Sequence, residues 1–266
     1  MFFWYSLIFI AGLTLGSYLN SWMWRVHEPA RLATRSVAGG NRLGSRSVCI
    51  HCNRALAWYE NIPLCSFLVL RGKCRTCRKP IPADYFLVEL VTALLFVGIT
   101  YYHLSLSVFS PWHFFRDVFF AALLIVVFIY DLKYYIILPG LVLAGAVVAF
   151  IINIRYLTFS IQHLAIGLAI GGGFFLLQYV VSKGRWIGKG DIYLGVMMGA
   201  LLGWPVIVVA LFLSYVLGAL VSVPLLVSKK KNLNSEVPFG TFLAVGTLAA
   251  MFWGEPIVRW YSGLLK

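Results

Sequence analysis

The chain has 266 residues, of which 61% are hydrophobic and only 12% carry a charge. A soluble domain has roughly one charged residue in four, so this composition excludes an ordinary soluble protein and indicates a membrane protein. The formal net charge of +13 does not call for a nucleic-acid partner, because membrane proteins concentrate Lys and Arg in their cytoplasmic loops.

Apolar segments recur along the whole chain. A membrane-spanning helix needs about 17–25 mainly apolar residues, a length that most of these segments reach. We therefore expect an all-α polytopic membrane protein with about eight transmembrane helices and one polar insertion at residues 23–84. The eight segments are residues 2–22, 85–103, 114–130, 136–154, 161–181, 192–204, 206–227 and 238–253.

The basic residues predict which loops face the cytoplasm. The first segment has no basic residue before its apolar core and no small-residue cleavage site after it, so it is not a typical signal peptide. With eight spans, eighteen of the 22 Lys and Arg residues fall on one face, eleven of them within residues 23–84. That face is cytoplasmic by the positive-inside rule, which leaves the N-terminus outside.

Four cysteines in the insertion have the spacing of a metal site. Cys49 and Cys52 form one C-x2-C pair, and Cys74 and Cys77 form a second pair 21 residues later. Two such turns supply the four thiolates of a tetrahedral structural Zn²⁺ site, and a reducing cytoplasm disfavours disulfides. We expect a small zinc-ribbon-like module, with reduced or redox-active pairs as the alternative. Cys65, between the pairs, is expected to be a small buried residue.

The sequence between the two pairs leaves the role of this module open. It places aromatic, amide, carboxylate and basic groups close together in "NRALAWYENIPLCSFLVLRGK". Such a set of groups suits a binding site, whereas a purely structural metal site would need fewer polar groups. Trp58 and Tyr59 can equally be explained by packing against the metal module.

Two aspartates stand at the edges of apolar segments. Asp131 ends one segment in "VVFIYDLKYYIILP", and Asp191 opens another in "GKGDIYLG", after Gly188, Lys189 and Gly190. With the expected topology both lie at the inner boundary of the bilayer, where ionisable groups are costly and often functional. Glycines follow Asp191 at every fourth position, so a helix-packing stripe capped by an acidic residue is the alternative explanation.

A pair of carboxylates can perform peptide hydrolysis. One accepts a proton from water while the other donates a proton to the carbonyl oxygen. The sequence offers no competing H-E-x-x-H motif, phosphate-binding loop or dinucleotide fingerprint. We therefore predict that Asp131 and Asp191 come together in the fold as an aspartic peptidase site.

These residues resemble the type IV prepilin peptidases, the bifunctional leader peptidases and N-methyltransferases of the G-x-G-D aspartic class. Beside the double C-x2-C insertion, the resemblance rests on "GSYLNSWMWRV", "YFLVELVTALLF", "YDLKYYIILP", "GKGD" and "VPFGTFLAVG", which cover nearly the whole chain in order. Two positions depart from the family pattern. Tyr193 stands where the family often has Lys, and Pro139 comes about one residue late.

The resemblance implies two reactions at a bacterial inner membrane. Asp131 and Asp191 would cut a prepilin or pseudopilin after the glycine that ends its short basic leader. The new N-terminal residue, commonly Phe, would then be methylated with S-adenosylmethionine as donor. The family ties the insertion to methyl transfer, for which the candidate residues are Glu60, Asn61, Gly72, Lys73, Asn20 and Arg25.

This reading divides the chain into a first helix at 1–22, a cytoplasmic methyl-transfer region at 23–84 and a peptidase bundle at 85–266. Two alternatives remain from the sequence. One is a presenilin-like intramembrane aspartic protease without methyltransferase activity. The other is a transporter or assembly scaffold with a zinc clasp, since carboxylates in spans also serve proton pathways.

Overall fold

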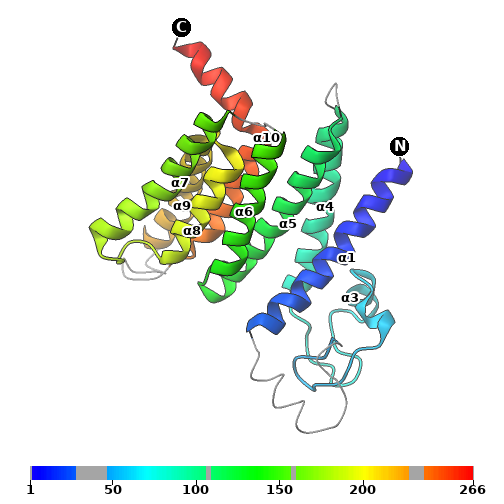
Figure 1. Ribbon diagram of the computed structural model, residues 1–266. Coiled ribbons are helices and arrows are strands. Elements are labelled where there is room, and N and C mark those ends of the chain that lie inside the picture. Colours follow the sequence, from blue (N-terminus) through cyan, green and yellow to red (C-terminus); the bar gives the residue numbers. More distant parts are fainter. Residues whose placement is uncertain (1, 28–46, 106–108, 157–159, 228–236, 266) are drawn as a thin grey trace. The chain divides into compact units, whose positions relative to one another are not determined.

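The computed structural model describes residues 2–27, 47–105, 109–156, 160–227 and 237–265. Within these ranges the chain is mainly helical, and each of the eight apolar segments overlaps one long helix (Figure 1). Two isolated β-bridges and no regular strand occur in the described part of the chain. The long helices are α1 (Phe2–His27), α4 (Ala83–Ser105), α5 (Pro111–Tyr134), α6 (Pro139–Tyr156), α7 (Ile161–Ser182), α8 (Lys189–Leu202), α9 (Val206–Val227) and α10 (Phe239–Leu264).

Four of these helices are long and apolar enough to cross a membrane, namely α4, α7, α9 and α10. Of the others, α6 is a shorter apolar helix over Pro139–Arg155, and α8 has only 14 residues. The helices also extend beyond the apolar segments. The largest extension is in α10, which continues through Glu255 and Pro256 to Leu264 because a helix can continue past the apolar stretch that marks a span.

The chain forms two compact units, Met1–Ser110 and Pro111–Lys266. In the first unit, α1 packs along α4 at two glycines. A β-carbon added at Gly12 would lie 2.6 Å from the Cα of Ala93, and one at Gly16 would lie 2.8 Å from the Cα of Glu89. Small residues spaced in this way allow close contact between membrane helices. Helix α4 therefore belongs to the same compact unit as α1 and the cysteine insertion.

The second unit holds the six long helices α5–α10, and α8 lies at its centre. The glycines of α8 do form a packing stripe, because Gly195 and Gly199 touch the backbone of Gly171 and Gly167 on α7. The apolar core around this contact has no exposed surface at Phe175, Leu194, Met197, Met198 and Leu243. This tight core fixes the start of α8, where Asp191 lies.

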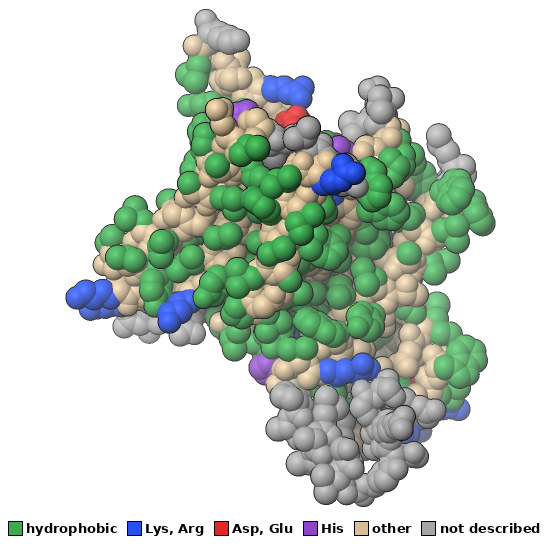
Figure 2. Space-filling model, viewed as in Figure 1, with side chains coloured by type: hydrophobic (Ala, Val, Ile, Leu, Met, Phe, Trp, Pro, Cys, Tyr) green, Lys and Arg blue, Asp and Glu red, His purple; other side chains and the backbone are tan. Residues whose placement is uncertain are grey.

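The outer faces of the helices are apolar, as membrane helices require. Exposed side chains include Leu177 at 64%, Phe212 at 66% and Leu220 at 65% of their full accessible surface. Figure 2 shows hydrophobic side chains over most of the described surface on the visible face. Side chains of this size would be costly to expose to water, so these faces match lipid.

Candidate functional site

Asp131 lies near the end of α5 and is held by the beginning of α10. Its side chain is buried, and its Oδ2 accepts a hydrogen bond of 2.9 Å from the backbone N–H of Thr241. A second backbone hydrogen bond comes from Gly240. The first N–H groups of a helix have no partner within the helix, so the carboxylate of Asp131 caps α10 from a distant part of the sequence.

Asp191 lies in the first turn of α8 and is held by its own loop. Gly188 is the residue that caps this helix, and its backbone N–H donates a hydrogen bond of 3.0 Å to Oδ2 of Asp191. Lys189 is the first helical residue and is exposed. A β-carbon at Gly190 would lie 2.8 Å from Cβ of Ile137, so the loop approaches the segment between α5 and α6 very closely.

The structure brings Asp131 and Asp191 to the same cleft. This cleft lies entirely in the second unit and has a volume of about 870 Å³. Both carboxylates are buried, and each has one oxygen fixed by a backbone N–H. Two oriented carboxylates facing one cavity can divide the roles of proton acceptor and proton donor toward water and a bound carbonyl group.

Further polar side chains line this cleft, and the sequence analysis missed a hydrogen-bonded pair among them. Gln178 of α7 donates a hydrogen bond of 2.9 Å from its amide nitrogen to the hydroxyl of Tyr215 of α9. The ring of Tyr215 stacks edge-on against Phe239, with ring centroids 5.0 Å apart. The sequence did contain a signal, because Gln178 is an amide in an otherwise apolar segment. A polar side chain in a membrane is costly unless it has a hydrogen-bond partner.

Replacing Gly240 by Ala tests how closely the α10 cap positions Asp131. The added β-carbon would lie 3.0 Å from Oδ2 of Asp131 and 2.9 Å from Cδ1 of Ile137, so the carboxylate must shift. We expect peptide cleavage to slow by roughly 10- to 100-fold, because small displacements of a catalytic group are costly. The matched control is Gly173→Ala in α7, which meets nothing within 4 Å and should cleave normally. Equal rates for wild type and Gly240→Ala would contradict this role.

The four cysteines of the first unit form one cluster. The Sγ atoms of Cys49, Cys52, Cys74 and Cys77 all lie within 4.8 Å of one another, and those of Cys49 and Cys77 are 3.9 Å apart. The sulfurs of a tetrahedral zinc site are about 3.8 Å apart, from a Zn–S distance of about 2.3 Å. The cluster therefore fits a metal ion after only a small contraction.

The two cysteine turns have the same backbone geometry. The carbonyl of the first cysteine in each turn accepts a hydrogen bond of 2.9 Å from the fourth residue after it, Asn53 in one turn and Arg78 in the other. Both of these residues have a left-handed conformation, with φ of 61° and 55°. In the second turn, backbone N–H groups of Cys77 and Thr76 lower the pKa of the Cys74 thiol to about 6, which favours a metal-binding thiolate.

A partly buried ion pair holds the segment between the two turns in place. Nη2 of Arg54 donates a hydrogen bond of 2.6 Å to Oε1 of Glu60, and the N–H of Ala57 donates one of 2.8 Å to Oε2. Glu60 belongs to the short helix η2 (Trp58–Asn61), and its side chain is only 3% exposed. The hydrogen bond from Arg54 holds the pKa of the Glu60 carboxyl below its usual range.

This ion pair predicts an acid dependence of the insertion's stability. Because the pKa of Glu60 is lower in the folded chain, its contribution is complete above about pH 4.5, the unfolded value, and is lost as pH falls below it. Glu60→Gln should lower the stability of the insertion at pH 7 by about 1.5–3 kcal/mol, the range for hydrogen bonds to charged groups. Hydrogen exchange of residues 47–82 at pH 7 and pH 4, with metal content measured in parallel, checks this. A difference between the two proteins that stays constant over this range would contradict it.

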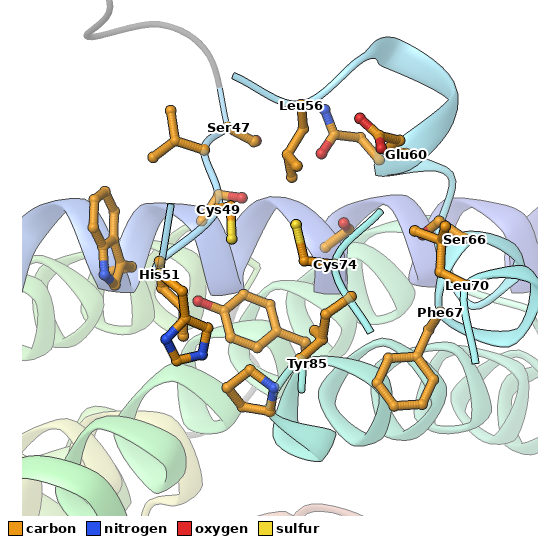
Figure 3. A pocket seen from close by; sticks show the side chains of 18 of the residues that line it. Ser47, Cys49, His51, Leu56, Glu60, Ser66, Phe67, Leu70, Cys74 and Tyr85 are labelled. Atoms are coloured by element: carbon orange, nitrogen blue, oxygen red, sulfur yellow. The ribbon is translucent and has the colours of Figure 1, made fainter. Parts of the chain in front are cut away.

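A cavity of about 150 Å³ adjoins the cysteine cluster within the first unit. Among the methyl-transfer candidates, Arg25, Glu60 and Asn61 line it. Figure 3 shows the sulfurs of Cys49 and Cys74 pointing toward each other, with Glu60 and Tyr85 on opposite sides. The structure thus joins the end of α1, the cysteine turns and the start of α4 around one space.

The remaining candidates lie nearby but outside the lining of this cavity. Asn20 is buried on α1, and its amide donates a hydrogen bond of 3.2 Å to the carbonyl of Tyr85. Gly72 has φ of 66°, and a β-carbon there would lie 3.1 Å from the ring of Phe67. Lys73 forms an isolated bridge with Pro80. Arg25, Glu60 and Asn61 therefore face the cavity, whereas these three residues do not.

One expectation about the insertion was wrong. Cys65 is exposed, because it begins a short helix, α3 (Cys65–Val69), that has no buried residue. Of the two explanations open for Trp58, packing against the metal module does not hold, since the side chain is 79% exposed. Its neighbour Tyr59 does contact the second cysteine turn, since its hydroxyl accepts a hydrogen bond of 2.7 Å from Arg75. An insertion this short cannot build a core large enough to cover these side chains, so they stay at the surface.

Comparison with known proteins agrees with both units. Residues 10–103 match the family model for the bacterial peptidase A24 N-terminal domain, and residues 118–223 match the type IV leader peptidase family. A prepilin leader peptidase/N-methyltransferase of Aeromonas hydrophila is 30% identical over 97% of this chain and 93% of its own length. The proteins of the same name from Stutzerimonas stutzeri and Legionella pneumophila are 31% and 32% identical, over 95% and 82% of this chain and 91% and 76% of their own lengths.

These matches show a peptidase, and the structure is a helical membrane protein with two aspartates in one cleft. The chain belongs to the type IV leader peptidase family. It is an enzyme, and with its apolar helices it is a multi-pass protein of the inner membrane. A comparison with solved structures finds no match.

Proposed function

We propose that this enzyme removes the leader of type IV prepilins or pseudopilins after a glycine and then methylates the new N-terminus. Its relatives carry the name prepilin leader peptidase/N-methyltransferase, and the match extends over nearly the whole chain. The observation that carries the proposal is the cleft shared by Asp131 and Asp191. Family membership does not favour a presenilin-like protease without methyl transfer or a transporter.

In this proposal Asp131 and Asp191 are the catalytic pair. One carboxylate takes a proton from water as the water oxygen attacks the scissile carbonyl carbon, and the other protonates the carbonyl oxygen. Collapse of the tetrahedral intermediate breaks the C–N bond, and the leaving amine takes a proton from the pair. The backbone bonds from Thr241 and Gly188 keep both carboxylates in place throughout. Lys189, between the two loop glycines, supports the turn that presents Asp191.

The cysteine cluster would hold a structural Zn²⁺ ion in the first unit, which would fix the two turns beside the 150 Å³ cavity. The mixed lining of that cavity, apolar with a few charged and polar groups, suits S-adenosylmethionine, which supplies the methyl group when it is bound. Arg25, Glu60 and Asn61 would hold it, with Asn20, Gly72 and Lys73 nearby. In this way the two reactions have separate sites on separate units.

We also propose that all eight long helices cross the bilayer, with the N-terminus outside and the insertion in the cytoplasm. The strong excess of basic residues in residues 23–84 supports this orientation. The functional division would then be a first helix at 1–22, a methyl-transfer region at 23–84 and the peptidase bundle at 85–266. The shared packing of α4 with α1 suggests that the methyl-transfer region also draws on the start of α4.

The test uses the purified full-length protein in detergent with a synthetic prepilin that contains its leader and the following apolar segment. Mass spectrometry should find one cut, after the leader glycine, and a gain of one methyl group on the new N-terminal residue when S-adenosylmethionine is present. Cleavage at several unrelated sites, or no cleavage, would contradict the proposed substrate. Cleavage without a mass gain would contradict the second activity.

A further inference from the structure

The first unit contains a buried carboxylate that the proposed peptidase chemistry does not use. Glu89 lies two turns into the apolar helix α4 and is only 8% exposed. Its Oε2 accepts a hydrogen bond of 2.9 Å from the backbone N–H of Leu64, and it also has a hydrogen bond with the side chain of Ser17. Both partners are neutral, so nothing in these contacts balances a negative charge.

A buried carboxylate without a cation is costly, and this cost needs a reason. A glutamine could accept the same hydrogen bond from Leu64 without bringing a charge into the helix pair. The other buried acid of this unit, Glu60, has its cation in Arg54. Within the described residues no Lys or Arg forms an ion pair with Glu89, which therefore has the chemistry of a binding group for a cation from outside the chain.

Glu89 also faces a space in which such a cation can bind. It lines the 150 Å³ cavity together with Ser17, Ser66, Phe67 and Phe86. The rings of Phe67 and Phe86 pack against each other with centroids 5.2 Å apart. A carboxylate beside neutral hydroxyls and two aromatic rings suits an amine that is attached to an apolar or aromatic side chain.

The opposite part of the cavity has the opposite charge. Ser17, Ser21 and Arg25 all line it and lie four residues apart, so they share one face of α1. At a rise of about 1.5 Å per residue, Arg25 is roughly 12 Å along the helix from Ser17. Arg75 and Lys79 of the second cysteine turn line the cavity too. Glu60 also lines the loop end but is paired with Arg54, so the cavity has an acidic end within the helix pair and a mainly basic end at the loops.

We propose that Glu89 binds the α-ammonium group of the processed substrate and takes the proton that this group must lose before it can be methylated. The inference rests on the proposed function, in which the substrate begins with an apolar or aromatic residue on a membrane helix. An N–H bond of the ammonium breaks, its electron pair stays on nitrogen, and the proton bonds to a carboxylate oxygen of Glu89. The amine can then act as a nucleophile, and Glu89 later returns the proton to water.

The experiment measures peptide binding to the full-length protein in detergent, so that it does not depend on turnover. The probe is a synthetic peptide beginning with Phe and continuing as an apolar segment, with either a free or an acetylated N-terminus. We expect wild type to bind the free amine about tenfold more tightly, the effect of one charge-assisted hydrogen bond. Glu89→Gln should reduce this preference to less than twofold, and Glu255→Gln, an exposed acid of α10, should keep it.

Glu89 could bind either the ammonium group of the peptide or the sulfonium group of S-adenosylmethionine. Binding of S-adenosylmethionine to the same variants distinguishes these two cations. If Glu89→Gln weakens donor binding and keeps the preference for the free amine, Glu89 belongs to the donor site and the proposal is wrong. Hydrogen exchange of residues 47–82 reports whether the first unit of each variant is folded. Should Glu89→Gln fail that check, Glu89→Asp and Ser17→Ala are compared, and a full tenfold preference in both would overturn the proposal. A failure of the proposed function itself would appear instead in wild type, which would not methylate the peptide at all.

Discussion

Replacing Asp131 or Asp191 by Asn should each reduce leader cleavage by at least about 1,000-fold, because each change removes one partner of the proton transfer. Both carboxylates line the same cleft, and a hydrogen-bonding amide of the same size preserves the backbone contacts only in part. The double variant should be no worse than either single one, since residues that act as a unit are not additive. Cleavage of a synthetic prepilin, followed by mass spectrometry, measures all three.

Two controls make this result specific. The exposed Glu255→Gln changes the same functional group outside the cleft and should cleave at the wild-type rate. The aspartate variants should still methylate a peptide that already begins with Phe, because the cysteine cluster and its cavity lie in the other unit. Normal cleavage by both Asn variants would exclude catalysis by these two aspartates.

Replacing Cys49 and Cys52 together by Ser should release the bound metal and reduce methyl transfer by more than about 100-fold. Structural zinc contributes roughly 10–16 kcal/mol to the folding of small zinc modules, so half the ligand set cannot keep the turns in place. Both cysteine turns border the cavity proposed for the methyl donor. Metal analysis of the purified protein and transfer of a labelled methyl group to a peptide substrate check the two effects.

The chain supplies its own control in Cys65, which is exposed and outside the cluster. Cys65→Ser should keep one metal ion and full methyl transfer. Leader cleavage should fall much less than methyl transfer in the Cys49, Cys52 variant. An equal loss of both activities would show that the metal module also shapes the peptidase cleft, and retention of the metal would exclude the four-thiolate site.

The elements of this protein follow from local patterns that can be read along the chain. Apolar runs predicted the eight long helices of the described residues. In a membrane, a helix satisfies every backbone N–H and C=O group while its apolar side chains face lipid or the core. Paired cysteines predicted a four-sulfur cluster, since a C-x2-C turn presents two sulfurs to one point. The glycine stripe after Asp191 predicted the close contact with α7, although the identity of the partner helix was not evident.

Several features depended on contacts between residues far apart in sequence. The N–H of Thr241, 110 residues beyond Asp131, is one such contact, and no local pattern links the two. Tyr215 and Gln178 likewise meet only because α7 and α9 border one cleft. The exposure of Cys65 was mispredicted because burial depends on what packs over a residue rather than on its own polarity.

The sequence by itself determined the class of fold, the cysteine cluster and the two acidic positions, because helix length, ligand spacing and charge placement are properties of short segments. Only the tertiary structure decided that Asp131 and Asp191 share a cleft, that Arg54 neutralises Glu60, and that Glu89 is buried without a cation. The physical reason is that proximity and burial arise from helix packing, which no single segment specifies.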